Sequence, residues 1–118
     1  MVNKILCFDL DNTICKTVRN FYKKSTPYKS KISLINALYK KGYEIKIFTS
    51  RFMGRNNDNQ KKAIKSGYFF TKKQLDSWGL KYHKLILGKP SYDVLIDDKS
   101  LFFKKNWSKY LLNKLKNK

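Results

Sequence analysis

Four short apolar runs divide the chain, and each has the length and composition of a β-strand. They cover residues 3–9, 43–49, 84–87 and 92–96. The first run is nearly continuous in its apolar character, which is typical of a strand that is covered on both faces in a parallel sheet. The pattern therefore predicts four strands.

Apolar residues also recur at helical spacing, in residues 32–39 and again in residues 106–115. Residues 60–66 predict a weak helix, and a capping-box pattern that opens at Thr71 predicts a separate short helix ending near Gly79. Strands that alternate with helices favour an α/β fold with a mainly parallel sheet. We expect a three-layer, Rossmann-like arrangement with helices on both faces.

The length and composition of the chain fit one domain over residues 1–118, and 42% of the residues are hydrophobic, which is enough for a core. Residues 12–28 are polar and irregular, long enough only for a small flap over a site. No apolar run approaches the roughly 20 residues of a membrane span. The first apolar run ends in acids, unlike a signal peptide. We expect a cytoplasmic protein without a membrane segment, with Cys7 and Cys15 as free thiols.

The formal net charge of +19 suggests a nucleic-acid partner at first sight. However, 24 of the 27 basic residues are lysines scattered along the whole chain, a pattern that solvated surface lysines explain. A basic nucleic-acid-binding module without catalysis remains an alternative, and we expect only weak, salt-sensitive binding. The positive field would still attract an anionic substrate.

Acidic residues are rare, and half of them stand where a predicted strand meets its loop. Ligand sites in parallel sheets lie beyond the carboxyl ends of the strands, so residues that follow different strands are expected to meet there. Carboxylates at such buried positions are costly unless they bind a positive group, and a divalent metal is the natural candidate. The acids concerned are Asp9, Asp11, Asp97 and Asp98.

Asp9 and Asp11 are two residues apart in an extended segment, so their side chains face the same way. One carboxylate of such a pair can attack phosphorus, while the other protonates the leaving oxygen and then activates water. Asp97 would supply a further metal oxygen. Thr49 and Lys89, each near the end of a predicted strand, are placed to hold the phosphoryl oxygens.

The order of these motifs resembles that of the haloacid dehalogenase superfamily, which is composed mostly of Mg²⁺-dependent phosphohydrolases. Residues 8–13, Phe-Asp-Leu-Asp-Asn-Thr, match its first motif, and Thr49, Lys89 and the Asp97-Asp98 pair match the other three. The resemblance implies Asp9 as nucleophile and Asp11 as general acid/base, with Asp9, Asp11 and Asp97 as metal ligands. Asp98 would act through water or hydrogen bonds.

Members of that superfamily often carry a cap domain between the motifs, but the gaps here leave no room for one. We therefore expect a capless enzyme with an open site. Residues 49–55, with Gln74 to Gly79, Tyr82-His83 and residues 88–93, are similar to small capless phosphatase-like proteins of capsular polysaccharide biosynthesis. That similarity implies a phosphorylated sugar, polyol or amino alcohol as the substrate.

Four further residues are candidates for contact with the substrate, namely Thr13, Ser50, Arg51 and Arg55. The two arginines flank Gly54 and are able to form a fork for a phosphate or carboxylate. The main hypothesis is thus a Mg²⁺-dependent phosphomonoesterase. The alternative within enzymes is a phosphatase on a nucleic-acid end or a phosphoprotein, because an open site admits large substrates. A homo-oligomer is plausible because the site lacks a cover.

Overall fold

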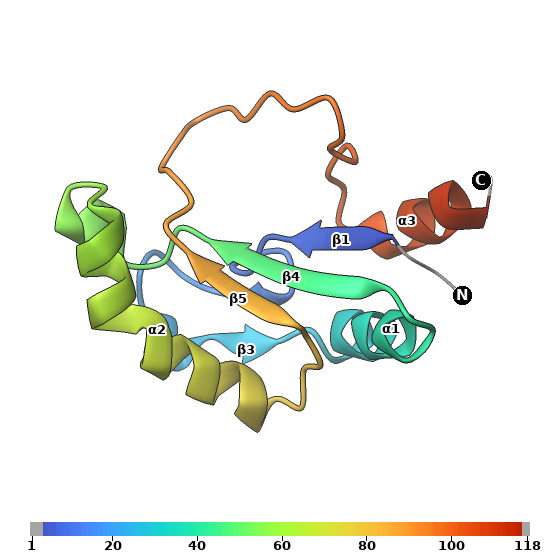
Figure 1. Ribbon diagram of the computed structural model, residues 1–118, viewed down its shortest axis with the longest axis horizontal. Coiled ribbons are helices and arrows are strands. Elements are labelled where there is room, and N and C mark those ends of the chain that lie inside the picture. The colour runs from blue at the N-terminus through green and yellow to red at the C-terminus, as the bar shows by residue number, and fades with distance from the viewer. Residues whose placement is uncertain (1–3, 117–118) are drawn as a thin grey trace.

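A computed structural model describes residues 4–116 and shows an α/β fold built on a parallel three-stranded sheet (Figure 1). The strand order is β1-β4-β5, so β1 and β5 form the two edges. A second, antiparallel pair of short strands, β2 and β3, lies in the flap region. The elements are β1 (Ile5–Phe8), β2 (Cys15–Lys16), β3 (Thr26–Pro27), α1 (Lys29–Lys40), β4 (Glu44–Thr49), α2 (Gln60–Ser77), β5 (Lys84–Leu87) and α3 (Trp107–Lys116).

The buried side chains of the sheet lie on one face. In the central strand β4, the buried residues Ile45, Ile47 and Thr49 alternate with partly buried ones. The parallel register pairs Ile47 with Phe8 of β1 and with Leu85 of β5, and both of these are buried as well. Side chains of one face lie side by side across paired strands, so these residues form a continuous apolar layer.

Three helices complete the core with their apolar stripes. Helix α1 buries Ile32, Ile35 and Leu38, a spacing that places all three on one side of the helix. Helix α3 contributes Trp107, whose indole N–H donates to the carbonyl of Thr13 over 3.2 Å and whose ring lies 5.6 Å from that of Phe8.

The prediction of three layers is not met in the described residues, because the second face of the sheet carries no fully buried side chain. Ile5 and Cys7 of β1 are exposed there, and Lys46 and Phe48 of β4 are only partly buried. The α/β class, the parallel sheet and the absence of an extra domain within residues 4–116 agree with the sequence prediction.

The two separate helices predicted over residues 60–66 and 71–79 are one helix, α2. Its N-terminus is capped by Asn59, whose side chain accepts a hydrogen bond of 3.0 Å from the backbone N–H of Lys62. The predicted capping box at Thr71 is wrong, because Thr71 belongs to a buried stripe with Gly67 and Leu75. Packing of this small residue against the core outweighs its local preference for a cap.

The predicted fourth strand over residues 92–96 is also wrong. No helix or strand forms between β5 and α3, and this connecting segment arches away from the sheet (Figure 1). The alternation of Val94 and Ile96 satisfies the local rule for a strand, but a strand exists only when a partner supplies its backbone hydrogen bonds. Both side chains are exposed as a result.

Residues 12–28 form a small flap, as predicted, although it is more regular than expected. Cys15 and Lys16 of β2 pair with Pro27 and Thr26 of β3.

Among residues 4–116, no helix combines the length and the apolar character that a membrane crossing would need.

The exposure of the segment between β5 and α3 predicts that its apolar residues add little to stability. Ile96 is 92% exposed, whereas Ile47 is fully buried. Without added divalent cations, Ile96→Ala should change the free energy of unfolding by less than about 0.5 kcal/mol, and the matched Ile47→Ala should lower it by about 2–5 kcal/mol. Urea denaturation of both variants measures this, and a loss above about 1 kcal/mol for Ile96→Ala, double the surface limit, would show that the segment packs.

Candidate active site

The carboxyl ends of the three parallel strands meet at one edge of the sheet, and polar residues collect there. Asp9 follows β1, Thr49 ends β4 and Lys89 comes two residues after the end of β5. The backbone N–H of Lys89 donates to the carbonyl of Thr49 over 3.2 Å, which ties the last two of these chain segments together. The structure thus brings three of the four predicted motifs to one place.

Asp9 is the more accessible of the two paired carboxylates. Its Oδ2 accepts a hydrogen bond of 3.0 Å from the hydroxyl of Thr13, and its Oδ1 lies 3.3 Å from the ammonium of Lys89. The Asp9 side chain is 37% exposed, against 10% for Lys89. A carboxylate that is held from one side and open on the other is suited to receive an incoming electrophile.

The environment keeps Lys89 charged. Burial disfavours the ammonium, but the hydrogen bond with Tyr92 and the charge of Asp9 outweigh burial, so the pKa of Lys89 is raised above its ordinary value. Any stability that the raised pKa of Lys89 contributes is fully present below the ordinary lysine pKa. It is lost only as the pH rises through the raised pKa. Lys89 is therefore a permanent cation at physiological pH.

Asp11 is held much more tightly than Asp9. Arg51 binds it through Nε, at 3.0 and 3.1 Å from the two carboxylate oxygens, and through Nη2, at 2.8 Å from Oδ1. The hydroxyl of Thr17 in the flap also donates to Oδ1 over 2.6 Å. Charge-assisted contacts of this kind are the strong class of hydrogen bond, and they fix the orientation of the carboxylate.

Arg51 has no exposed side-chain surface, and each part of its guanidinium has a partner. Nη1 donates to the side-chain oxygen of Gln74 over 2.6 Å, and Nη2 lies 3.3 Å from the hydroxyl of Ser25 in the flap. The guanidinium carbon lies 4.7 Å from the centre of the Tyr22 ring. Arg51 therefore connects β1, β4, the flap and helix α2 around Asp11.

The other residues that the sequence placed around the substrate lie in two different parts of the structure. Thr49 is buried, and its hydroxyl accepts a hydrogen bond of 3.1 Å from the backbone N–H of Arg51, while Ser50 is partly buried beside it. Arg55 is exposed and donates to the carbonyl of Asn20 in the flap over 3.3 Å. The two arginines do not form the predicted fork, because Arg51 turns inward to Asp11 and Arg55 turns to the flap.

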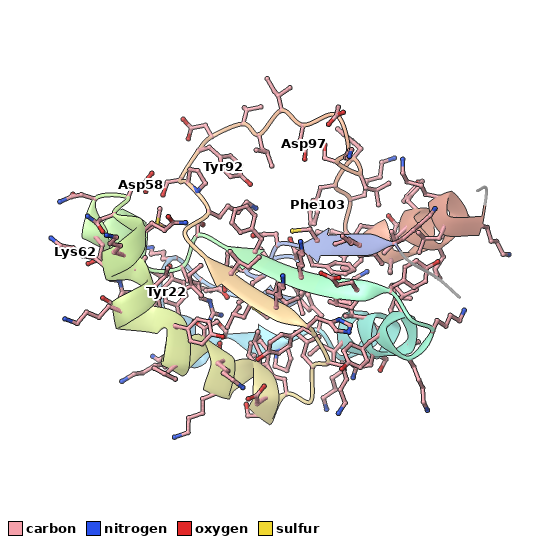
Figure 2. The ribbon with its side chains drawn as sticks, in the orientation of Figure 1. Tyr22, Asp58, Lys62, Tyr92, Asp97 and Phe103 are labelled. Atoms are coloured by element: carbon pink, nitrogen blue, oxygen red, sulfur yellow. The ribbon has the colours of Figure 1, made fainter. Side chains whose placement is uncertain are left out.

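The acidic pair after the fourth predicted strand is not gathered into the site. Asp97 and Asp98 are exposed on the arching segment, and Oδ1 of Asp97 accepts a hydrogen bond of 3.2 Å from the backbone of Lys99 (Figure 2). Among residues 4–116, no three His, Cys, Asp or Glu side chains are grouped so that they would hold a metal ion. The metal ligand set predicted from the sequence stays a prediction.

The two cysteines lie near the proposed site without joining its hydrogen bonds to Asp9 or Lys89. Burial raises the pKa of the Cys7 thiol, Lys89 and Lys46 lower it, and the charges of Asp9 and Asp97 raise it further. Cys7 and Cys15 are free thiols, and burial raises the pKa of Cys15 to about 11, so it is a poor nucleophile at neutral pH.

Three residues of the site were not found from the sequence, namely Thr17, Ser25 and Gln74. Their roles arise from tertiary contacts with Asp11 and Arg51, and isolated Ser, Thr and Gln residues carry no pattern. The one sequence signal that included any of them was the similarity of residues 49–55 and 74–79 to capsule-related phosphatases, which covers Gln74.

A second cavity, of about 540 Å³, lies between α2 and β5, and none of the predicted site residues lines it.

Comparison with known proteins adds support for the fold. A structural-genomics target from Vibrio cholerae, known from its crystal structure, is similar to this chain with a TM-score of 0.77 and 24% sequence identity. The likeness covers 95% of this chain and 98% of that one. No family model and no curated protein matches the sequence. The comparisons therefore show a shared fold.

The difference in burial between the two carboxylates predicts a difference in stability. Asp11→Asn leaves the fully buried Arg51 without its charge partner, and should lower the free energy of unfolding by about 3 kcal/mol. Asp9→Asn should cost less than Asp11→Asn, because the Asp9 side chain is 37% exposed and solvent weakens its ion pair with Lys89. Urea denaturation measures both, and a double variant Asp11→Asn/Arg51→Met should regain part of the loss. Equal losses for the two single variants would contradict the assignment.

Proposed function

We propose that the protein is a phosphomonoesterase of the haloacid dehalogenase type, which forms an aspartyl-phosphate on Asp9. The observation that carries the proposal is the gathering of Asp9, Asp11, Thr49 and Lys89 at the carboxyl edge of a parallel sheet, with a cation bound to each carboxylate. Two like charges this close repel each other, and the cation beside each carboxylate offsets part of that repulsion.

The proposed reaction has two steps. A carboxylate oxygen of Asp9 attacks the phosphorus and the bond to the leaving oxygen breaks, while Asp11, which enters this step carrying a proton, gives that proton to the leaving oxygen. A water molecule then attacks the phosphorus, Asp11 takes its proton, and the bond to Asp9 breaks to release inorganic phosphate. The ammonium of Lys89, 3.3 Å from Asp9, stabilises the charge that collects on the phosphoryl oxygens.

The similarity to capsule-related phosphatases makes a small phosphorylated metabolite, such as a sugar, polyol or amino-alcohol phosphate, the proposed substrate. The positive charge of the chain supports an anionic substrate of any kind, since it raises the rate of encounter with anions. Whether a metal takes part is a separate question.

The described side chains do not fit a Mg²⁺ ion where they now stand. Asp9 and Asp11 are each engaged by a protein cation, and Asp97 belongs to the arching segment. The steps above therefore assign nothing to a metal. Mg²⁺ remains part of the proposal only if Asp97 approaches Asp9, which requires another position of the segment between β5 and α3. The unpaired edge of β1 and the exposed apolar residues of that segment favour such a movement.

The nucleophile is tested by Asp9→Asn. This change keeps the size of the side chain and removes the attacking charge, so the rate of phosphate release should fall by at least about 10³-fold. A panel of phosphorylated sugars, polyols and amino alcohols, with released phosphate as the readout, measures the effect. Asp93→Asn is the matched control, because Asp93 is exposed and lies outside the site, and it should retain full activity. Normal activity of the Asp9 variant would end the proposal.

The metal is tested by binding rather than by turnover. If the segment between β5 and α3 brings Asp97 to Asp9, millimolar Mg²⁺ should raise the thermal midpoint of the unaltered chain by a few degrees, because a ligand that binds only the folded state stabilises it. Asp97→Asn should lose most of this shift, whereas Asp93→Asn should retain it. The same shift in all three proteins would mean that Asp97 holds no metal.

A further inference from the structure

A cavity of about 430 Å³ lies beside the proposed active site, between the flap and helix α2. Four aromatic rings line it, those of Phe21 and Tyr22 in the flap, Phe52 in the loop after β4, and Phe70 in α2. Its volume is within the range of pockets that bind small molecules. No step of the proposed hydrolysis accounts for it.

One of the four lining rings belongs to a residue with an unfavourable backbone conformation. Phe52 has a φ of 69°, a left-handed backbone conformation that is unfavourable for a bulky side chain. Its ring lies directly on α2, where a Cβ atom at Gly67 would overlap it. The ring centres of Phe52 and Tyr22 are 5.0 Å apart, and those of Phe52 and Phe70 are 6.1 Å apart. Strain of this kind persists where the surrounding structure requires it, and here it holds three rings together.

The charges around the cavity are all positive. The guanidinium carbon of Arg55 lies 4.6 Å from the centre of the Phe52 ring and 5.4 Å from that of Tyr22. Lys23 and Lys24 also line the cavity, and no acid does. An aromatic cage without such neighbours would suit a quaternary ammonium group. Here Arg55 lies over the rings of Phe52 and Tyr22, so the cavity disfavours a cation and favours an anion, and the lining rings of Phe21 and Phe70 are left for stacking.

The cavity and the proposed active site share a wall. The ring of Tyr22, which lines the cavity, lies 4.7 Å from the guanidinium carbon of Arg51, and Arg51 binds Asp11 on its other side. Figure 2 shows Tyr22 beside helix α2, and the carbonyl of Tyr22 accepts a hydrogen bond of 2.7 Å from the side chain of Gln74 in that helix. A ligand in the cavity is therefore separated from Asp11 by two side chains, those of Tyr22 and Arg51.

We propose that this cavity binds an organic anion that carries a flat ring, and that a nucleotide is the class of ligand. Bases stack on aromatic side chains and on arginine, and neighbouring cations bind the phosphates, which is how proteins bind single nucleic-acid strands. The inference rests on the proposed function for the identity of the reacting phosphate. It makes the nucleoside part of the ligand the leaving group and disfavours amino-alcohol phosphates.

Binding without turnover tests this. The full chain carrying Asp9→Asn is titrated by calorimetry, at physiological ionic strength, with adenosine 5′-monophosphate, ribose 5-phosphate and phosphocholine as probes. Adenosine 5′-monophosphate should bind about tenfold more tightly than ribose 5-phosphate, because the base adds one stacking contact. Phosphocholine should bind most weakly. Equal affinities for the first two probes would overturn the proposal.

Neighbouring phenylalanines of α2 provide a matched pair of variants. Phe70→Ala removes a cavity ring and should abolish the tenfold preference for the base, whereas Phe69→Ala, at a side chain 80% exposed and outside the cavity, should leave it unchanged. If Phe70→Ala fails to fold, Ser66→Trp fills the cavity from an exposed lining position and should have the same effect. An equal response of the Phe69 and Phe70 variants would contradict the site.

A phosphorylated hexanucleotide distinguishes the two sources of such a ligand, namely the end of a nucleic-acid strand and a free nucleotide. Tighter binding than the mononucleotide, with sensitivity to Phe70→Ala, assigns the cavity to strand ends; the reverse order of affinity assigns it to free nucleotides. Hexanucleotide binding that Phe70→Ala does not weaken reflects net charge alone and counts against the site.

The cavity and the proposed function can fail separately. If nucleotides bind but the unaltered chain releases no phosphate, the proposed function fails and the site stands. If the chain releases phosphate without any preference for a base, the proposed function stands and the nucleotide site fails.

Discussion

The site depends on the pairing of each carboxylate with its own cation. Asp9 and Asp11 are brought together by the geometry of one strand end, and Lys89 and Arg51 come from loops after two other strands. Without these cations, mutual repulsion would raise the free energy of the ionised pair. The parallel sheet matters because it delivers all four charges to a single edge. The two ion pairs differ, since one is open to solvent at the acid and the other encloses a fully buried guanidinium.

The buried pair also makes the flap part of the site. Arg51 is fixed by Gln74 of α2 and by Ser25 of the flap, and Gln74 in turn donates to the carbonyl of Tyr22 over 2.7 Å. A displacement of the flap therefore changes the surroundings of Asp11 directly, without a long chain of intermediate contacts. The aromatic cavity shares Tyr22 with this network, so a ligand there and the acid at Asp11 act on the same segment.

The sequence predicted most of the sheet and the polar residues at its edge, because both follow from local patterns. Apolar runs located β1, β4 and β5 to within two residues, and acids after an apolar run indicated Asp9 and Asp11. The sequence failed where a structure depends on a distant partner. The alternation in residues 92–96 is typical of a strand but does not say what it would pair with. Likewise, Thr71 resembles a cap until its burial against the core is known.

The contacts that order Asp11 connect its proposed role as an acid to the flap. As an acid, Asp11 would have to carry a proton, while its oxygens accept hydrogen bonds from Arg51 and Thr17. Arg51 is buried and held by several partners, whereas Thr17 directly follows strand β2 of the flap hairpin. A movement of the flap would therefore take one hydrogen bond away from Asp11 and leave its ion pair with Arg51 in place.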